Sequence, residues 1–287
     1  MLPALIRRLA MDILTDGLSF PEGPRWHDGR LYFSDFYRHV VETVTEDGRR
    51  TTIADVPNQP SGLGWLPDGC LLIVSMLDRK LLRQEPDGTL TEHADLNGVA
   101  TWHCNDMIVD SQGRAYVGNF GFDTHGDVPP SPARLARVDP DGSVTAVADE
   151  LQFPNGTIIF PDGATIVIAE TRAMRLTAFD IDASGNLSNR RVWADIDPHV
   201  PDGICLDAEG GIWVADPRGN CVIRVLKGGE ITDRIDTGRG AFACMLGGND
   251  GRTLFVCTAT GSGPHAEARR DGRIESTKVE IPRDGLP

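Results

Sequence analysis

Six passages along the chain repeat the same order of polar and apolar positions. Each passage starts with a small or polar residue, continues through apolar residues to a turn that ends in glycine, and then enters an alternating or apolar strand. The turn glycines, in chain order, are Gly29, Gly69, Gly113, Gly163, Gly210 and Gly251. They are separated by 40, 44, 50, 47 and 41 residues. A period of this length, built from short strands and Asp-Gly turns, predicts a β-propeller with four strands in each blade.

The pattern between the turns favours an all-β chain. Residues 144–148 and 175–179 alternate or run apolar, and no segment of 12 residues has a helical period. We therefore expect a six-bladed β-propeller with four antiparallel strands per blade, closed by pairing of the N-terminal and C-terminal segments. Residues 273–282 are expected to form a strand that completes the first blade. The expected organisation is an N-terminal extension over 1–12 and a single propeller domain over 13–287.

Length and charge narrow this picture. A chain of 287 residues would by itself suggest about two domains, but one closed ring of six repeats accounts for its length. Lys and Arg total 28 against 42 Asp and Glu, a formal net charge of -14. Such a surface repels phosphate backbones and anionic lipids, so we expect neither a nucleic-acid partner nor a membrane partner.

The start of the chain does not have the order of a signal peptide. Residues 1–10 place two arginines inside a short apolar stretch, whereas a signal peptide carries its positive charge first. No stretch approaches the roughly 20 apolar residues of a membrane span. We predict a cytoplasmic protein, a monomer or small homo-oligomer, whose translation starts at Met1 or Met11. Its six cysteines include no C-x-x-C pair and are predicted to be buried and reduced.

One position of the repeat concentrates side chains that could bind a metal ion. The innermost strand of each propeller blade lines the central channel, so equivalent positions of the repeats face one another. At this position the repeats carry Glu22, Ser61, Asn105, Asn155, Asp202 and, approximately, Cys244. Oxygen donors converging from different blades suit a hard cation such as Ca²⁺, Mg²⁺ or Mn²⁺, and Zn²⁺ is also compatible. The alternative is that these six residues are structural turn residues that coincide in position, because Asn and Asp also favour turns. Glu has no such preference, which favours the metal site.

Five passages of the chain resemble the SMP-30/gluconolactonase/LRE family. They are residues 20–26, 104–107, 153–156, 201–204 and 243–248. The resemblance extends over almost the whole chain, from about Leu14 to Pro282. It implies a six-bladed propeller that holds one divalent metal ion in its channel and hydrolyses lactones or related esters.

The matching motifs imply roles for individual residues. Glu22, Asn155 and Asp202 would be the metal ligands, and Asn105 would bind the substrate or a metal-bound water. Calcium is the metal expected, with zinc, magnesium, manganese and iron as alternatives. The chain departs from animal members of the family at His103, where they have an arginine. A proline-rich loop after the third repeat is a second departure, and we expect it to overhang the pocket mouth.

These residues suit the hydrolysis of a sugar lactone, an aldono-1,4- or aldono-1,5-lactone, to the sugar acid. The metal would polarise the carbonyl, and Asp202 would act both as a ligand and as general base toward the attacking water. His103 is predicted to bind the substrate and is the rival general base, because imidazole transfers protons near neutrality. The chain has no Gly-x-Ser-x-Gly elbow, and Cys104 should face away from His103 because adjacent strand residues point to opposite sides.

Other polar residues are expected to be structural. Asp35, Glu170 and Asp216 each end a predicted strand. They could add charge around the metal ligands, but we expect water to solvate them at the end of a hairpin. His199 lies in a loop without a partner at a useful spacing.

Two rival functions remain at this stage. One is an ester or phosphotriester hydrolase of broader specificity that uses the same metal, and the other is a non-catalytic metal-binding scaffold. A scaffold would present aromatic or arginine anchors on its blade rims and would not need carboxylates in its channel. Aromatic residues make up only 6% of the chain, and several lie in predicted strands, which favours an enzyme. The partner expected for an enzyme is a small-molecule lactone or ester.

Overall fold

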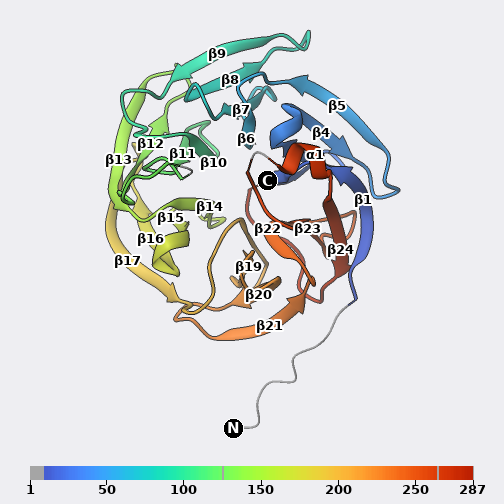
Figure 1. Ribbon diagram of the computed structural model, residues 1–287. Helices are drawn as coiled ribbons and strands as arrows, with labels where there is room; N and C mark the ends of the chain where they lie inside the picture. Colours follow the sequence, from blue (N-terminus) through green and yellow to red (C-terminus); the bar gives the residue numbers. More distant parts are fainter. Residues whose placement is uncertain (1–9, 125, 264, 287) are drawn as a thin grey trace.

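Four-stranded antiparallel sheets surround a central axis, which confirms the six-bladed propeller (Figure 1). The computed structural model describes residues 10–124, 126–263 and 265–286, and its sheets lie within these residues. The inner strand of each of the first five blades comes first along the chain, and three strands follow it outward. In each blade, the hairpin between the two innermost strands closes on one of the six turn glycines, all of which have a positive φ.

The strand bounds follow the repeat. Blade one contains β2 (Pro21–His27), β3 (Arg30–Asp35), β4 (Val40–Val44) and β5 (Arg50–Asp55). Blade two contains β6 (Pro60–Trp65), β7 (Leu71–Ser75), β8 (Lys80–Gln84) and β9 (Leu90–Asp95). Blade three contains β10 (Cys104–Val109), β11 (Ala115–Asn119), β12 (Ala133–Val138) and β13 (Val144–Leu151). Blades four and five contain β14 (Pro154–Ile159), β15 (Thr165–Glu170), β16 (Arg175–Ile181), β17 (Leu187–Asp195), β18 (Ile204–Leu206), β19 (Ile212–Asp216), β20 (Cys221–Val225) and β21 (Ile231–Asp236).

The sixth blade is built from both ends of the chain. From the axis outward it contains β22 (Gly240–Gly247), β23 (Thr253–Ala259), β24 (Gly272–Lys278) and β1 (Asp12–Leu18). Pairing of β1 with β24 closes the ring as predicted, and Figure 1 shows the two strands side by side. Residues 1–9 of the expected N-terminal extension lie outside the described residues.

The prediction that residues 273–282 complete the first blade is wrong. Each repeat starts at the axis, so the first repeat already supplies all four strands of blade one, β2 to β5. The last repeat is the one that lacks an outer strand. β24 is therefore the third strand of blade six, and the N-terminal strand β1 is the fourth.

The inner strands are interrupted at the position that faces the channel. The pairing register of β2 with β3 shifts between Glu22 and Arg25, and that of β14 with β15 shifts between Pro154 and Thr157. A β-bulge of this kind adds a residue to one strand and changes the direction of a side chain. Beyond the bulge, the side chains of the strand can again alternate between its two faces and enter the core.

Glycine follows the channel position where neighbouring inner strands approach closely. A Cβ atom at Gly156 would lie 2.4 Å from the backbone nitrogen of Ile204, and one at Gly62 would lie 2.4 Å from that of Met107. Any larger residue would push the two blades apart, which explains the glycine of these motifs.

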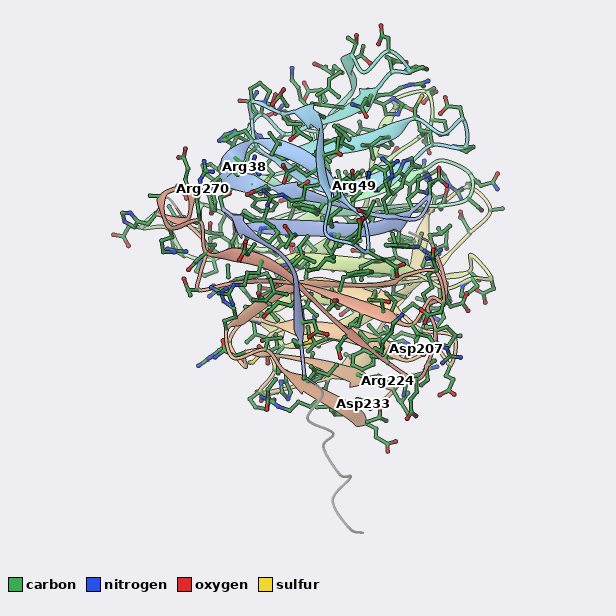
Figure 2. The ribbon with its side chains drawn as sticks, turned by 90° about the vertical axis from the view of Figure 1, so that its right-hand side faces the viewer. Arg38, Arg49, Asp207, Arg224, Asp233 and Arg270 are labelled. Carbon is green, nitrogen blue, oxygen red and sulfur yellow. The ribbon has the colours of Figure 1, made fainter. Side chains whose placement is uncertain are left out.

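The two faces of the ring carry different structures. One face carries the short helices η1 (Phe36–Arg38), η2 (Thr171–Ala173) and α1 (Ala266–Arg269). In the edge-on view of Figure 2, Arg38 and Arg270 lie at one face, whereas Asp207 and Arg224 lie at the other. The helix-bearing face is the one on which the main cavity opens.

The C-terminal residues cross the opposite end of the channel. The backbone N–H of Asp284 donates to the carbonyl of Leu206 at 3.1 Å, and the Arg283 guanidinium donates to the carbonyl of Trp26 at 3.1 Å. The channel therefore opens on the helix-bearing face.

The core lies within and between the blades. Its largest cluster joins Leu18 and Phe33 of the first strands to Trp213 of blade five and Phe255 of blade six. All six cysteines are unpaired and buried, as predicted. In the part of the chain that the structure describes, no helix is long and apolar enough to cross a membrane.

Candidate metal and substrate site

A cavity of about 500 Å³ opens on the face that carries η1 and η2. The five residues predicted to act in function all line it: Glu22, His103, Asn105, Asn155 and Asp202. They come from blades one, three and four and from the connection into β18 of blade five. The repeat thus brings together residues up to 180 positions apart, although their roles remain predictions.

Asn155 and Asp202 are in direct contact across the boundary between blades four and five. The Asn155 amide donates to the Asp202 carboxylate and lies 3.3 Å from the Thr171 hydroxyl. That hydroxyl donates at 2.8 Å to the carbonyl of Pro201, the residue before Asp202. The contacts fix the amide so that its carbonyl oxygen stays available to the cavity. On the other side of the channel, Glu22 accepts the backbone N–H of Gly23 at 3.1 Å.

The carboxyl groups of Glu22 and Asp202 lie in an environment that disfavours their charged forms. Burial, followed by the charge of Asp202, raises the pKa of Glu22 well above its ordinary value. Burial, followed by the charge of Asp106, likewise raises the pKa of Asp202. Each group therefore resists ionisation unless a cation compensates it.

A buried ion pair beside these carboxylates was missed by the sequence analysis. The Arg25 guanidinium lies 2.6 Å from Asp106 and donates at 2.5 Å to the carbonyl of Met107. The two residues are 81 positions apart and both are buried. The sequence did contain a signal for this pair, because Arg25 and Asp106 each lie within a motif that resembles the family. In those motifs, roles were predicted only for the neighbouring residues Glu22 and Asn105.

The donor set fits a divalent cation. When ionised, the carboxyl groups of Glu22, Asp106 and Asp202 carry three negative charges against the one positive charge of Arg25, and one divalent ion would neutralise the difference. Two carboxylates and an amide carbonyl are hard oxygen donors of the kind preferred by Ca²⁺ and Mg²⁺. Glu22, Asn155 and Asp202 are therefore the residues that could hold the ion.

Three further carboxylates, Asp35, Glu170 and Asp216, are buried rather than solvated, which corrects the sequence prediction for them. Each one binds the connection that leads into the inner strand of its own blade. Asp35 accepts the backbone N–H of Ser19 and of Phe20, both at 3.0 Å. Glu170 accepts that of Gln152 at 2.7 Å.

Asp216 performs the same task through a side chain. It lies 2.7 Å from Nδ1 of His199, three residues before Asp202, so His199 has a buried partner that the sequence analysis did not find. Asp216 also accepts the backbone N–H of Gly219 at 2.8 Å. Although Cys221 is close to both, with ligand atoms within 4.8 Å, burial raises the pKa of its thiol to about 11. The cluster therefore serves as a loop anchor.

The distribution of these carboxylates follows that of the predicted metal ligands. Asp35 pairs with Pro21, directly before Glu22, and Glu170 pairs with Pro154, directly before Asn155. The other blades have uncharged residues at the equivalent strand end, which are Ser75, Asn119 and Ala259. Blades one, four and five are thus the blades with both a carboxylate anchor and a predicted ligand.

The sixth repeat does not place Cys244 at the channel position. In blade six, Gly240 pairs with Ala259 as Pro21 pairs with Asp35 in blade one, so Ala241 is the equivalent of Glu22. Cys244 is buried in the core and lies 3.9 Å from the sulfur of Cys205. The first hairpin of blade six is longer than those of the other blades. Counting back from its turn glycine therefore gave Cys244 instead of Ala241 as the channel position.

Cys104 does not take part in the site. Its side chain is 1% exposed, and burial raises the pKa of its thiol to about 12. His103 lines the cavity, and its ring stacks against Trp102 with centroids 4.7 Å apart. Neighbouring residues thus face opposite environments, as expected.

Aromatic rings form much of the cavity wall, a feature that the sequence analysis missed. Its aromatic lining residues are Phe20, Phe36, Tyr37, Phe120, Phe122, Phe153 and Phe242. The loop after the third repeat contributes Phe122 and Thr124 to the lining. A partial signal was present, because a Phe-Pro pair precedes both Glu22 and Asn155.

The fold and the site together define a six-bladed propeller with a cluster of oxygen donors in a largely apolar cavity. The chain belongs to the family described as SMP-30/Gluconolactonase/LRE-like region, which matches residues 20–260. It is 32% identical over 263 residues to the pentonolactonase XacC of Haloferax volcanii, covering 87% of this chain and 85% of that protein.

Solved structures share the fold. A luciferin-regenerating enzyme superposes with a TM-score of 0.83 at 19% identity, covering 97% of this chain and 98% of that one. A calcium-binding regucalcin from Agrobacterium tumefaciens superposes with a TM-score of 0.82 at 23% identity, covering 99% and 98%.

Proposed function

We propose that this protein is a divalent-metal-dependent lactonase. The observation that carries the proposal is the cavity floor, where the oxygen donors of Glu22, Asn155 and Asp202 converge and burial disfavours the charged carboxylates unless a cation is bound. The pentonolactonase relative and the family match support lactone ring opening as the reaction. A relative that is a calcium-binding protein supports calcium as the first metal to test.

The chain's own residues suit ester hydrolysis. A bound divalent cation supplies Lewis-acid polarisation of a carbonyl and lowers the pKa of water. Asp202 faces the cavity and accepts the proton of the attacking water on a carboxylate oxygen. Asn105 donates from its amide to the substrate, and His103 orients the substrate from the cavity wall.

The relatives support a sugar lactone as substrate. The curated relative acts, by its name, on pentonolactones, and an aldono-1,4- or aldono-1,5-lactone is the class predicted from sequence. The broader ester hydrolase remains the second candidate, because the aromatic wall does not require a sugar.

The metal assignment is tested by two variants, Glu22→Gln and Asp202→Asn. Both should lower lactone turnover on the order of 100-fold or more, because each removes a charged ligand. Calcium binding measured by titration calorimetry should weaken in parallel, while circular dichroism shows an intact fold.

Glu275→Gln is the matched control. Glu275 is also buried and accepts the Thr258 hydroxyl at 2.8 Å, but it lies in blade six outside the cavity. It should retain metal binding and turnover. Full activity of the double variant in the presence of chelator would contradict the proposal.

A further inference from the structure

Phenylalanine is concentrated around one cavity of this protein. Six of the ten Phe residues of the chain line it, together with one of the three Tyr residues. An even distribution over the chain would place fewer than one Phe among so few positions. Aromatic residues make up only 6% of the chain, so their concentration in the wall of the predicted site requires an explanation.

The rings form two clusters. In the first, Phe20 packs edge-on against Phe242 with centroids 4.7 Å apart, and Phe36 lies 5.5 Å from Phe20. In the second, Phe120 stacks on Phe153 at 4.8 Å with an interplanar angle of 11°.

The two clusters face each other across the channel. The first belongs to blades one and six, and the second to blades three and four. In a ring of six, blade one lies opposite blade four, and blade six lies opposite blade three (Figure 1). The space above the predicted metal ligands is therefore a slot between two aromatic walls.

One wall residue has an unfavourable backbone. Phe153 has a φ of +61°, in the left-handed region that bulky side chains rarely adopt. Residues held in such conformations cluster at functional sites, where the surrounding structure stabilises them. The strained backbone directs the ring toward Phe120 in the cavity instead of into the core.

Polar residues line the cavity together with the aromatic rings. Glu22, Asn155 and Asp202 form the floor, while Arg172 and Ser262 are exposed at the mouth. Leu77, also at the mouth, is 41% exposed, which extends the apolar surface outward. Gln59, His103, Asn105, Thr124 and Thr171 also line the cavity, but a sugar hydroxyl that lies against the face of a Phe ring finds no hydrogen-bond partner on that ring.

We propose that the substrate is a lactone bearing a hydrocarbon group, an aryl ring or an alkyl chain. The lactone carbonyl lies at the floor, and the hydrocarbon lies between the two aromatic clusters. This inference rests on the proposed lactonase function, but it departs from the sugar lactone that the relatives support, because it assigns a hydrocarbon group to the lactone ring. The reaction is unchanged, since water adds across the ring ester and gives a hydroxy acid.

A series of δ-alkyl-δ-lactones tests the slot, from δ-hexalactone to δ-dodecalactone. All members share one ring and a secondary alkoxide leaving group, so chain length is the main variable. With the calcium-loaded enzyme in a pH-stat, kcat/KM should rise about fourfold per added methylene until the slot is filled. The longer members should exceed glucono-1,5-lactone and a pentono-1,4-lactone by at least about tenfold.

One ring from each wall provides the variants, Phe120→Ala and Phe242→Ala. Each should flatten the chain-length dependence, so that kcat/KM falls more for the longer alkyl lactones than for the aldonolactones. Phe160→Ala is the control, because Phe160 is similarly half-buried but lies outside the cavity, past the far end of β14.

The outcomes separate the two proposals. Hydrolysis of aldonolactones with no gain along the alkyl series overturns the slot and leaves the lactonase function standing. An equal loss on both substrate classes in the wall variants also overturns the slot. If no lactone is hydrolysed with any divalent metal, the lactonase function fails and the inference fails with it.

Discussion

Asp202 is held by the amide of Asn155 on one side and faces Glu22 and Asp106 through their charges on the other. Without a bound cation, burial and then the charge of Asp106 raise the pKa of Asp202. Groups perturbed in this way concentrate at functional sites. At the scale of single residues, Asp202 is therefore the best candidate for the general base, and His103 is its rival.

The rivalry is decided by a pH–rate profile of His103→Ala. If His103 only orients the substrate, KM should rise about tenfold while the acidic limb of kcat keeps its midpoint. His39→Ala is a suitable control, because the His39 ring binds the carbonyl of Pro57 in a loop. Loss of the acidic limb together with a fall in kcat of about 100-fold or more would assign the base to His103.

Part of the site could be predicted at this scale, and the missing part has a physical reason. Glu22, Asn155 and Asp202 recur at one point of a repeat, so their position is encoded locally. The ion pair of Arg25 with Asp106 joins two blades and follows no spacing rule. The aromatic wall consists of residues from loops and strand ends of four blades, so no periodicity in the sequence predicts it.

At the scale of elements, each inner strand depends on the loop that leads into it. Asp35, Glu170 and Asp216 bind these loops in the three blades that carry predicted ligands. Although burial opposes ionisation, the Thr177 hydroxyl, the Gln152 amide and Arg175 lower the pKa of Glu170 below its ordinary value. The charged form is thus the one that the loop stabilises. These anchors could not be predicted because a strand-end carboxylate reads equally well as solvated.

Removing an anchor should weaken metal binding through the ligand that follows it. We expect Asp216→Asn and Glu170→Gln to lower calcium affinity about 10-fold to 100-fold, the range for partners that orient ligands. Titration calorimetry measures this independently of turnover.

Ser75→Ala controls for a purely structural effect. Ser75 occupies the same strand end in blade two, which carries no predicted ligand, and its hydroxyl donates to Asp78 at 2.6 Å. This variant should leave calcium affinity unchanged. Equal losses of affinity in all three variants would show that the anchors act on stability alone.

At the scale of the whole molecule, closure makes the channel a shared property of all blades. β1 and β24 join the ends of the chain, and the channel charges come from blades one, three and five. The repeat period predicted this ring, but it could not show which blade the ends complete, because the outer strand carries no channel residue. The ring brings like charges together, so closing it costs free energy at neutral pH in the absence of a cation.

This cost should be visible in the stability of the metal-free protein. The folded-state pKa values of Glu22 and Asp202 are raised above the ordinary values of 4.5 and 3.8. A raised pKa means that the folded protein holds the proton more tightly, so its stabilisation is complete below the ordinary value. It is lost as pH rises through the folded-state value. In chelator, the melting temperature should therefore fall from about pH 4 toward neutrality for this reason.

Asp202→Asn removes one of these charges and should reverse part of the fall. At pH 7.5 in chelator it should melt about 2–6 °C above the wild type, because about 1–2 kcal/mol of charge burial is relieved. Calcium should raise the melting temperature of the wild type by mass action and leave that of the variant unchanged. Differential scanning calorimetry at pH 5 and pH 7.5 measures both effects, with Glu275→Gln as the control. A variant that melts below the wild type at pH 7.5 would mean that Asp202 stabilises the empty ring, and the cation would then not be needed to balance its charge.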